Sequence, residues 1–409
     1  MVNQTTRILL FSSLFPHRGE PTLGVFVENR LRHLIAEENV KAIVVAPVPW
    51  FPFKAKVFGK YGRFARAMRV EVRHGITIYH PRYLVIPKVG MNLTPMFMYW
   101  SALRCTRRLL GQGAKWNVID AHYLYPDGVA AAKLSKKLNI PFVMTARGSD
   151  VTEIGLVPSA RKMIKSALDV ASHTITVSNN LRRDLVAMGG KPEQITTLRN
   201  GVDTSFFKET KRSEMRKSWG EGPIMLFAGW LIPRKRLDLV LKVTALIPGI
   251  TTVIIGDGPL RSTLEVKAKH LGIYDRVIFA GQIAPEKMPE MYSGADVLLL
   301  PSDREGWANV LLESMACGTP VVTRDVGGAP DLVTQDEAGR LVKSDTPEKL
   351  SDAVKDLLLC LPDRKATRKF AQQFGWASTS KGQKQIFDAA ILKYNASRTK
   401  GEITDDKPK

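Results

Sequence analysis

Short apolar runs alternate with longer amphipathic segments along most of the chain. The runs are rich in Val, Ile and Leu, and each is short enough to be one buried strand. They lie at Ile8–Phe11, Ala42–Ala46, Val118–Ala121, Phe142–Thr145, Thr174–Val177, Met225–Ala228, Thr252–Ile255, Val277–Ala280, Val297–Leu300 and Pro320–Thr323. Near-continuous apolar strands separated by helices are typical of parallel sheets covered on both faces. The pattern therefore predicts an α/β fold.

The series of strands restarts near residue 222. A polar, charged stretch at 208–222 (KETKRSEMRKSWGEG) precedes the restart, and it is typical of a linker followed by an entry helix. We therefore expect a first domain at 1–207 and a second at 208–375. The segment 395–409 is polar throughout, which predicts a disordered tail.

Charge is distributed unevenly over the 409 residues. Residues 1–200 hold 29 Lys or Arg against 12 Asp or Glu, whereas the remainder holds 31 against 27. A strongly basic half predicts an anionic partner: nucleic acid, an anionic membrane surface or a phosphorylated acceptor. The alternative is a solvated basic face. The three cysteines are far apart in the sequence, which argues against disulfides and a zinc site and favours a reducing cytoplasm.

The segment 301–313 (PSDREGWANVLLE) is the richest in candidate chemistry. It follows a predicted strand and opens a helix expected to run to about Ala316. Backbone N–H groups at a helix start, with Gly306 permitting close approach, suit a diphosphate. Glu305 precedes the helix and Glu313 is expected about two turns inside it, so the pair can hold hydroxyls at the two ends of a nucleotide sugar. The alternative is one surface and one capping glutamate.

Other candidate residues also follow predicted strands, where ligands bind in open parallel sheets. The segment 229–236 places Gly229 before the cations Arg234 and Lys235, which suit phosphate, although a solvated loop is an equal alternative. Gly258 belongs to a Gly-x-Gly turn that lacks the third glycine of a dinucleotide fingerprint. A further glycine turn lies at 327–331.

The first half offers a second group of candidates. Gly24 follows the first strand and precedes a helix, so it can bring backbone amides near a ligand. His122 ends a predicted strand, as does the segment 145–150, which contains Arg147 and Asp150. A lone histidine is more often structural than catalytic, and its position at a strand exit favours a catalytic role only moderately.

Taken together, these segments resemble the retaining glycosyltransferases of family 4, which have the GT-B fold. The Glu305–Glu313 pair looks like the family's Glu-x7-Glu motif inside a Pro-Ser-x-x-Glu-Gly block, and the resemblance covers nearly the whole chain. Further similar segments are 11–16 with 24–27, found in members that build bacterial surface polysaccharides, and 200–203, 281–283, 315–322 and 374–376. The resemblance implies two Rossmann-like domains that face a central cleft. It also implies that a helix at about 376–394 completes the N-terminal, acceptor-binding domain.

The resemblance assigns roles to individual positions. Glu305 would bind the hydroxyls of the donor sugar and Glu313 the ribose. Ile283 lies in the turn that contacts the donor base, and Gly24 would approach the phosphates. The diphosphate would be held by Lys235 and by the backbone amides of Gly306, Trp307, Ala308, Asn309 and Val310.

Two positions depart from the family pattern. Trp230 stands where the family commonly has arginine, so Arg234 is the candidate replacement cation. Arg147 stands where histidine is frequent, and its permanent charge suits an anionic acceptor or the leaving phosphate.

The resemblance further implies a metal-independent, retaining hexosyltransferase without a resident cofactor. The donor would be a UDP- or GDP-linked sugar, and the chain lacks an Asp-x-Asp sequence that would bridge a metal to the diphosphate. The attacking hydroxyl can pass its proton to the leaving phosphate oxygen. The acceptor would be a glycan or a polyprenyl-diphosphate-linked glycan in exopolysaccharide biosynthesis.

Residues 54–108 hold many cations and one acid, Glu71, and aromatic and apolar side chains are interleaved with them from Trp50 on. The cations are Lys54, Lys56, Lys60, Arg63, Arg66, Arg69, Arg73, Arg82, Lys88, Arg104, Arg107 and Arg108. This mixture predicts a cytoplasmic protein that binds peripherally to the anionic inner face of the plasma membrane. The alternative is that the aromatic residues belong to the core and the cations are merely solvated.

The sequence lacks the marks of two other classes of α/β protein. A basic nucleic-acid-binding protein should show a basic recognition helix or an aromatic platform, and the sequence contains neither, so no nucleic-acid partner is expected. A nicotinamide-binding enzyme should carry Gly-x-Gly-x-x-Gly after its first strand, where this chain has Ser12-Ser13-Leu14-Phe15-Pro16.

Overall fold

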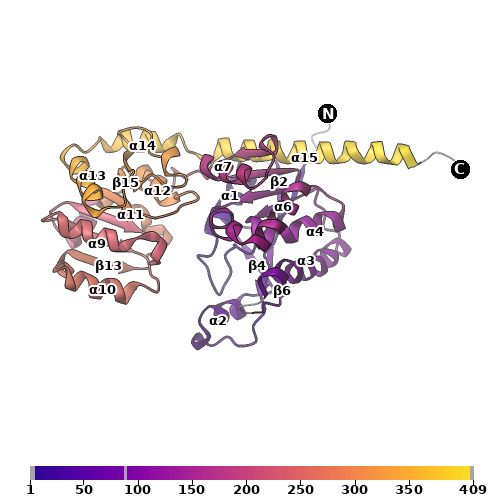
Figure 1. The fold of residues 1–409 in the computed structure, drawn as a ribbon, viewed down its shortest axis with the longest axis horizontal. Coiled ribbons are helices and arrows are strands. Elements are labelled where there is room, and N and C mark those ends of the chain that lie inside the picture. The colour runs from indigo at the N-terminus through magenta and orange to yellow at the C-terminus, as the bar shows by residue number, and fades with distance from the viewer. Residues whose placement is uncertain (1–4, 87–89, 406–409) are drawn as a thin grey trace. The chain divides into compact units, whose positions relative to one another are not determined.

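The protein is described from a computed structural model that covers residues 5–86 and 90–405, with side chains as far as Ser397. The chain divides into two compact units. Unit 1 consists of Met1–Arg199 and Ala377–Lys409, and unit 2 of Asn200–Trp376. Each unit has its own sheet flanked by helices (Figure 1), which confirms the predicted α/β class with two parallel-sheet domains.

The sheet of unit 1 has the strand order β10-β9-β8-β7-β1-β2-β5-β4. Its strands pair in parallel except for β4, which pairs antiparallel with β5. The strands are β1 (Thr6–Phe11), β2 (Val40–Val45), β4 (Val70–Arg73), β5 (Ile76–Tyr79), β7 (Val118–His122), β8 (Phe142–Ala146), β9 (His173–Thr176) and β10 (Ile195–Thr197). A separate short pair is formed by β3 (Val48–Pro49) and β6 (Arg82–Tyr83).

Helices cover the unit 1 sheet on both faces. They are α1 (Val25–Glu37), α3 (Thr94–Gly111), α4 (Val129–Leu138), α5 (Ser149–Thr152), α6 (Pro158–Val170), α7 (Asn179–Ala187) and α15 (Trp376–Asp405). Helix α2 (Gly59–Arg66) contacts β3 instead of the main sheet. On one face, Ile8 and Leu10 of β1 pack in a core with Leu31 of α1 and Phe387 of α15. Because side chains alternate along a strand, the buried Leu9 points to the other face. There α3, α4 and α6 lie side by side (Figure 1), with α4 against β7 and β8.

Unit 2 has an all-parallel sheet in the order β13-β12-β11-β14-β15-β16. The strands are β11 (Ile224–Ala228), β12 (Thr251–Ile255), β13 (Val277–Gly281), β14 (Val297–Leu300), β15 (Val321–Arg324) and β16 (Gly339–Val342). The helices are α8 (Arg212–Trp219), α9 (Leu237–Leu246), α10 (Arg261–His270), α11 (Met288–Gly294), α12 (Asn309–Ala316), α13 (Pro347–Leu359) and α14 (Arg364–Gln372). The four residues of β14 are fully buried, as expected for a central parallel strand.

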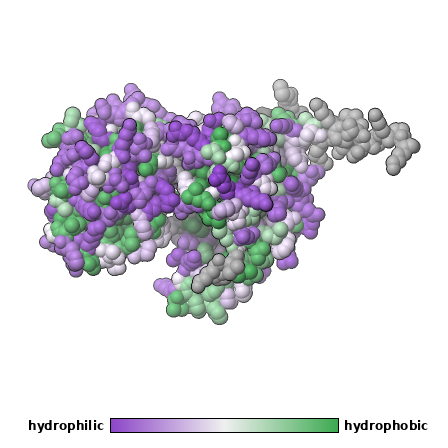
Figure 2. All heavy atoms as spheres, in the orientation of Figure 1, coloured by the Kyte–Doolittle hydropathy of each residue, from purple (hydrophilic) through white to green (hydrophobic). Residues whose placement is uncertain are grey.

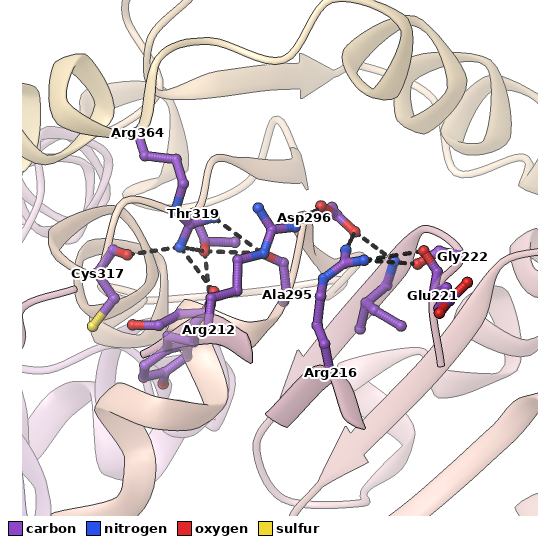
Figure 3. Close-up of polar contacts among 12 residues, drawn as sticks. Arg212, Arg216, Glu221, Gly222, Ala295, Asp296, Cys317, Thr319 and Arg364 are labelled. Carbon is purple, nitrogen blue, oxygen red and sulfur yellow. Dashed lines mark hydrogen bonds and ion pairs between the residues drawn. The ribbon is translucent and has the colours of Figure 1, made fainter. Parts of the chain in front are cut away.

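Arginines brace the edge of this sheet where the strands begin (Figure 3). Asp296, directly before β14, accepts hydrogen bonds from Arg212 and Arg216 of α8 and from the backbone N–H of Ile224 at 2.8 Å. Arg364, at the start of α14, donates to the carbonyl oxygens of Ser293, Ala295 and Cys317 at 2.9–3.1 Å. These guanidinium groups hold α8 and α14 against the sheet, at the edge opposite the carboxyl ends of the strands.

The boundary between the units lies earlier than the sequence suggested. The predicted second domain began at 208, whereas unit 2 begins at Asn200 and ends at Trp376. The reason is hydrogen bonding of the segment 200–207 to unit 2. Val202 N–H donates to Phe374 O at 2.9 Å, and Arg368 donates to the carbonyls of Thr204 and Phe207 at 2.7 and 2.8 Å.

The polar C-terminal segment also differs from its prediction. A disordered tail was expected from 395, but α15 continues to Asp405. Packing of Phe387 and a hydrogen bond from Tyr394 Oη to Asn139 Oδ1 at 2.7 Å fix the preceding turns. The sequence has no proline between Pro362 and Pro408 that would break the helix. Within residues 5–86 and 90–405, no helix combines the length and apolar character that crossing a bilayer requires.

Candidate active site

The candidate residues of unit 2 line one edge of its sheet. Strands β13, β12, β11 and β14 are neighbours, and all run in parallel. Gly229 follows β11, Gly258 follows β12, Ile283 follows β13 and Glu305 follows β14. Their loops therefore lie in a row at the carboxyl ends of the strands, where open α/β sheets bind ligands.

At this edge a cation and a carboxylate are in direct contact. Lys235 Nζ donates a hydrogen bond to Glu305 Oε1 at 2.6 Å, and Arg234 Nη1 lies 3.6 Å from Glu305 Oε2. The side chain of Glu305 is 8% exposed and that of Lys235 is 13% exposed. A short, largely desolvated pair of this kind is held in a defined geometry. The structure thus brings together three of the predicted site residues.

Two further residues, to which the sequence analysis gave no role, position the Glu305 loop. Asp303 accepts hydrogen bonds from Arg236 at 2.9 Å and from Arg324 at 2.6 Å, so the loops after β11 and β14 are tied to each other and to the last residue of β15. Gly327 has φ +55°, and a Cβ on it would lie 1.6 Å from the carbonyl oxygen of Glu305. Only glycine fits there, which explains the glycine turn seen at 327–331.

Helix α12 begins at Asn309, later than the sequence suggested. Trp307 and Ala308 are buried before it, and Gly306 and Val310 are half-buried. Glu313 is consequently about one turn inside the helix instead of two.

Glu313 is held by Tyr292 of α11, whose hydroxyl donates to Glu313 Oε2 at 2.7 Å. Burial raises the pKa of Glu313, and the bond from Tyr292 partly offsets this rise.

In unit 1, Gly24 caps the N-terminus of α1 in a left-handed conformation. Its φ is +64°, and a Cβ would lie 2.1 Å from Leu14 O, so the loop after β1 packs directly on the helix start. A glycine is therefore required at this turn for packing against Leu14, and the predicted approach of its backbone to a ligand stays a prediction.

The buried His122 and Asp120 and the half-buried Arg147 form a chain of contacts at the carboxyl ends of β7 and β8. Arg147 contacts His122 Nδ1, and His122 Nε2 lies 3.0 Å from Asp120 Oδ2. Because a guanidinium only donates, Nδ1 accepts and Nε2–H donates to Asp120. Burial lowers the pKa of His122 to about 4, which agrees with this neutral tautomer. The contact with His122 thus helps to fix the direction of the Arg147 side chain, whose Cζ also lies 5.2 Å from the ring centre of Phe26.

Two residues far apart in the sequence complete this chain. Gln383 of α15 donates from Nε2 to Asp120 Oδ2 at 3.0 Å and accepts from Arg30 Nε at 2.7 Å. All of these side chains are buried. Neither Gln383 nor Arg30 carries a motif in the sequence, so only the fold reveals their part in orienting Asp120 and His122.

Two carboxylates fix the adjoining loops. Asp150 accepts backbone N–H bonds from Leu124, Arg147 and Gly148 at 2.7–3.1 Å, so it shapes the turn that carries Arg147. Asp127 accepts from the hydroxyl of Ser13 at 2.9 Å and from the Ser13 backbone N–H. Burial raises the pKa of Asp127 to about 7. Asp150 thus fixes the backbone of the turn that carries Arg147.

Two family models match the chain, one in each half. The family described as "Glycosyltransferase Family 4" matches residues 23–206, and the family described as "Glycosyl transferases group 1" matches residues 209–374. Together the matches cover both units and include every predicted site residue.

Individual relatives support the same assignment. The Bacillus subtilis protein named as teichuronic acid biosynthesis glycosyltransferase TuaC is 28% identical over 85% of this chain and 88% of its own length. The D-inositol 3-phosphate glycosyltransferase of Acidothermus cellulolyticus is 31% identical over 69% of each chain. The crystal structure of Anabaena HepE in complex with UDP has the same fold, with a TM-score of 0.71, 18% identity and coverage of 94% and 100% of the two chains. The chain belongs to the group 1, or family 4, glycosyltransferases and has their GT-B fold.

Proposed function

We propose that the protein transfers a hexosyl group from a UDP- or GDP-linked sugar to a glycan, with retention of the anomeric configuration. The contact between Lys235 and Glu305 at 2.6 Å is the observation that carries this proposal. An ammonium group has three N–H donors, so its bond to Glu305 leaves two for oxygens of the donor diphosphate. Glu305 in turn accepts hydrogen bonds from hydroxyls of the donor sugar.

The proposed reaction breaks the bond between the sugar C1 and the diphosphate oxygen. The acceptor oxygen forms its bond to C1 on the same face, and its proton passes to the departing phosphate oxygen. Negative charge grows on the diphosphate as the bond breaks. Lys235, Arg234 and the backbone amides at the start of α12 would stabilise that charge, which is the largest contribution such a site can make. Glu313, held by Tyr292, would bind the ribose.

We assign donor binding to unit 2 and acceptor binding to unit 1. Arg147, held by His122 and Asp120, supplies a fixed cation for a phosphate on the acceptor. The name of the Acidothermus relative specifies a phosphorylated acceptor, and the name of TuaC specifies an anionic polysaccharide. Both names support an anionic acceptor or product. We propose that the acceptor is a polyprenyl-diphosphate-linked glycan at the cytoplasmic face of the plasma membrane, used in exopolysaccharide biosynthesis.

Metal independence forms part of the proposal. It is supported by the cations Arg234 and Lys235 at the carboxyl edge of the sheet and by the lack of Asp-x-Asp in the sequence. Turnover should survive treatment with EDTA. Loss of turnover in EDTA that manganese or magnesium restores would contradict this part.

A thermal-shift panel tests the donor assignment. Nucleoside diphosphates, their sugars, nicotinamide dinucleotides and single-stranded DNA are compared for the rise they cause in Tm. We expect a rise with one nucleoside diphosphate and its sugars. The anomeric configuration of the product, read by NMR, then tests retention. A rise with only nicotinamide dinucleotides or DNA, or a product of inverted configuration, would overturn the assignment.

A further inference from the structure

A small lobe of unit 1 exposes aromatic side chains that the rest of the fold leaves uncovered. It comprises residues 50–66, which contain the turn at Lys56–Phe58 and helix α2, and we call it the aromatic lobe. Trp50 is 55% exposed, Phe53 57%, Val57 85% and Phe58 40%. Figure 2 shows green, apolar residues gathered on the part of unit 1 that carries α2. Contiguous exposed apolar groups of this kind mark an interaction surface.

The aromatic lobe has its own small cluster of rings. The ring centre of Phe51 lies 6.0 Å from the ring centre of Phe53, and 5.4 Å from the ring centres of both Phe58 and Tyr61. Phe53 and Phe58 are stacked at 5.3 Å. These rings pack on one another, so the expectation that the aromatic residues of this region belong to the core does not hold for the lobe. Met98 of α3, an apolar but not aromatic residue of the same region, is fully buried.

The base of the lobe is held firmly. Trp50 N–H donates to Tyr83 O at 2.7 Å, and Arg66 Nη1 donates to Lys54 O at 3.0 Å. Gly62 lets α2 pack closely, because a Cβ there would lie 2.4 Å from Ala55 O. The apolar tip is therefore presented in a fixed shape, which lowers the entropic cost of binding.

The charge of the lobe and its surroundings is positive, which favours an anionic partner. Glu71 is the only acidic residue in the sequence between Glu38 and Asp120. Its carboxylate accepts from the backbone N–H groups of Arg18 and Met68 at 3.1 Å, and its side chain is 9% exposed. The single acid of this region thus faces inward, while Lys54, Lys56 and Lys60 of the lobe are exposed.

We infer that the aromatic lobe inserts into the headgroup region of an anionic bilayer and anchors unit 1 there. Exposed residues at 52–60 alternate apolar and lysine side chains. Such a segment can bury its rings at the acyl boundary while the lysines reach up to the lipid phosphates. Helix α3 adds the exposed Trp100 with the exposed cations Arg104, Arg107 and Arg108. Lys88 lies outside the described residues. The inference rests on the proposed transfer to a lipid-linked acceptor, which would be presented at the same surface.

Vesicle co-sedimentation of the full chain tests the inference. Phosphatidylcholine vesicles are compared with vesicles that also contain phosphatidylglycerol, across a salt series. We expect binding to the anionic vesicles that weakens as salt rises. The variant Trp50→Ser/Phe53→Ser/Phe58→Ser should bind at least tenfold more weakly. Lys54→Gln/Lys56→Gln/Lys60→Gln serves as a second variant that leaves the rings intact, and it too should weaken binding.

Matched controls remove equivalent groups from unit 2. They are Val266→Ser/Leu359→Ser/Leu361→Ser for apolar groups and Lys242→Gln/Lys355→Gln/Lys369→Gln for cations, all exposed in the parent. Both controls should bind like the parent. The inference would be overturned if both lobe variants bound vesicles as well as the parent. It would also be overturned if the parent bound vesicles with and without phosphatidylglycerol equally. Failure of the parent to bind vesicles, together with self-association that the serine variant abolishes, would overturn it too, since a second copy would then cover the lobe.

Activity separates this inference from the proposed function. With a water-soluble acceptor the lobe variants should turn over like the parent, and with a vesicle-embedded acceptor they should be slower. Vesicle binding itself needs no substrate. Absence of transfer with any donor would therefore contradict the proposed function while leaving the lipid-binding result to decide the inference.

Discussion

Lys235 Nζ and Glu305 Oε1 are 2.6 Å apart, although 70 residues separate them in the sequence. One follows β11 and the other follows β14, and these strands are neighbours in a parallel sheet. The topology of the sheet thus creates a pair of opposite charges at its carboxyl edge. In the proposed reaction, this pair connects the donor diphosphate to the donor sugar.

Removal of the Lys235 cation should weaken donor binding. A charge-assisted hydrogen bond contributes about 1.5–3 kcal/mol, which corresponds to roughly 10- to 100-fold in affinity. Calorimetry with the preferred nucleoside diphosphate should therefore show Lys235→Ala to bind at least about tenfold more weakly than the parent. Lys242→Ala, an exposed lysine on α9, is the control and should bind like the parent. An unchanged Kd in Lys235→Ala would exclude Lys235 from diphosphate binding.

Gly327→Ala should have two effects: it strains the backbone at residue 327, and it displaces the Glu305 loop. Alanine in a left-handed conformation costs about 1–2 kcal/mol. Gly272 provides the matched control, because its φ is +66° and nothing lies within 4 Å of a Cβ there, whereas at Gly327 the Cβ would strike Glu305 O. We expect Gly272→Ala to lower Tm slightly and keep kcat. Gly327→Ala should lower Tm further and reduce kcat at least tenfold, since displacements of about 1 Å can cost 100-fold. Equal effects of the two substitutions would show that the contact is unimportant.

Tyr292→Phe should change the pH dependence of nucleotide binding. The Tyr292 hydroxyl lowers the pKa of Glu313, which burial raises. Without that donor the pKa of Glu313 rises further, so the carboxylate becomes protonated at a higher pH. Tyr292→Phe should therefore lose its affinity for the nucleotide at a higher pH than the parent does. Tyr274→Phe removes the hydroxyl of an exposed tyrosine. It should leave unchanged the pH at which half of the nucleotide affinity is lost. A midpoint that stays fixed in Tyr292→Phe would argue against ribose binding by Glu313.

His122 should make unit 1 sensitive to acid. Its pKa is lowered from 6.5 to about 4 by burial, so the unfolded chain binds a proton between these values and the folded chain does not. This contribution to stability is complete above pH 6.5 and is lost as pH falls toward 4, with an upper bound of about 3 kcal/mol. His122→Gln keeps one donor and one acceptor but does not titrate. The parent should lose stability relative to His122→Gln over this range in chemical denaturation, and parallel curves would contradict the assignment.

The sequence predicts those strands that are continuous apolar runs. Val297–Leu300 has the same bounds in the sequence analysis and in the structure, because full burial leaves an unambiguous signal. The hairpin of β4 and β5 was missed, although its two-residue turn at His74 and Gly75, both with positive φ, is typical of tight hairpins. Strand β4 is an edge strand of the sheet, and its apolar residues Val70 and Val72 are exposed. Its sequence therefore lacks the continuous apolar run that marks a buried strand.

The candidate site was predicted where chemistry coincides with a strand exit, as at Glu305, Lys235 and Arg147. The supporting residues were not predictable. Gln383 orients Asp120 only because α15 packs on the unit 1 sheet, a contact between positions 263 residues apart. Asp303 acquires its role from two arginines, one in the loop after β11 and one at the end of β15. Such residues carry no local pattern, so only the three-dimensional structure identifies them.

The rate of sugar transfer by Glu305→Gln tests the central claim most directly. Glutamine keeps the shape of the side chain but removes the charge that pairs with Lys235 and meets the donor sugar. With the donor found in the thermal-shift panel, kcat should fall about 100-fold or more, as for loss of one group that stabilises developing charge, while the nucleoside diphosphate still binds. A Glu305→Gln enzyme whose kcat stays within a few-fold of the parent would contradict the assignment of this site.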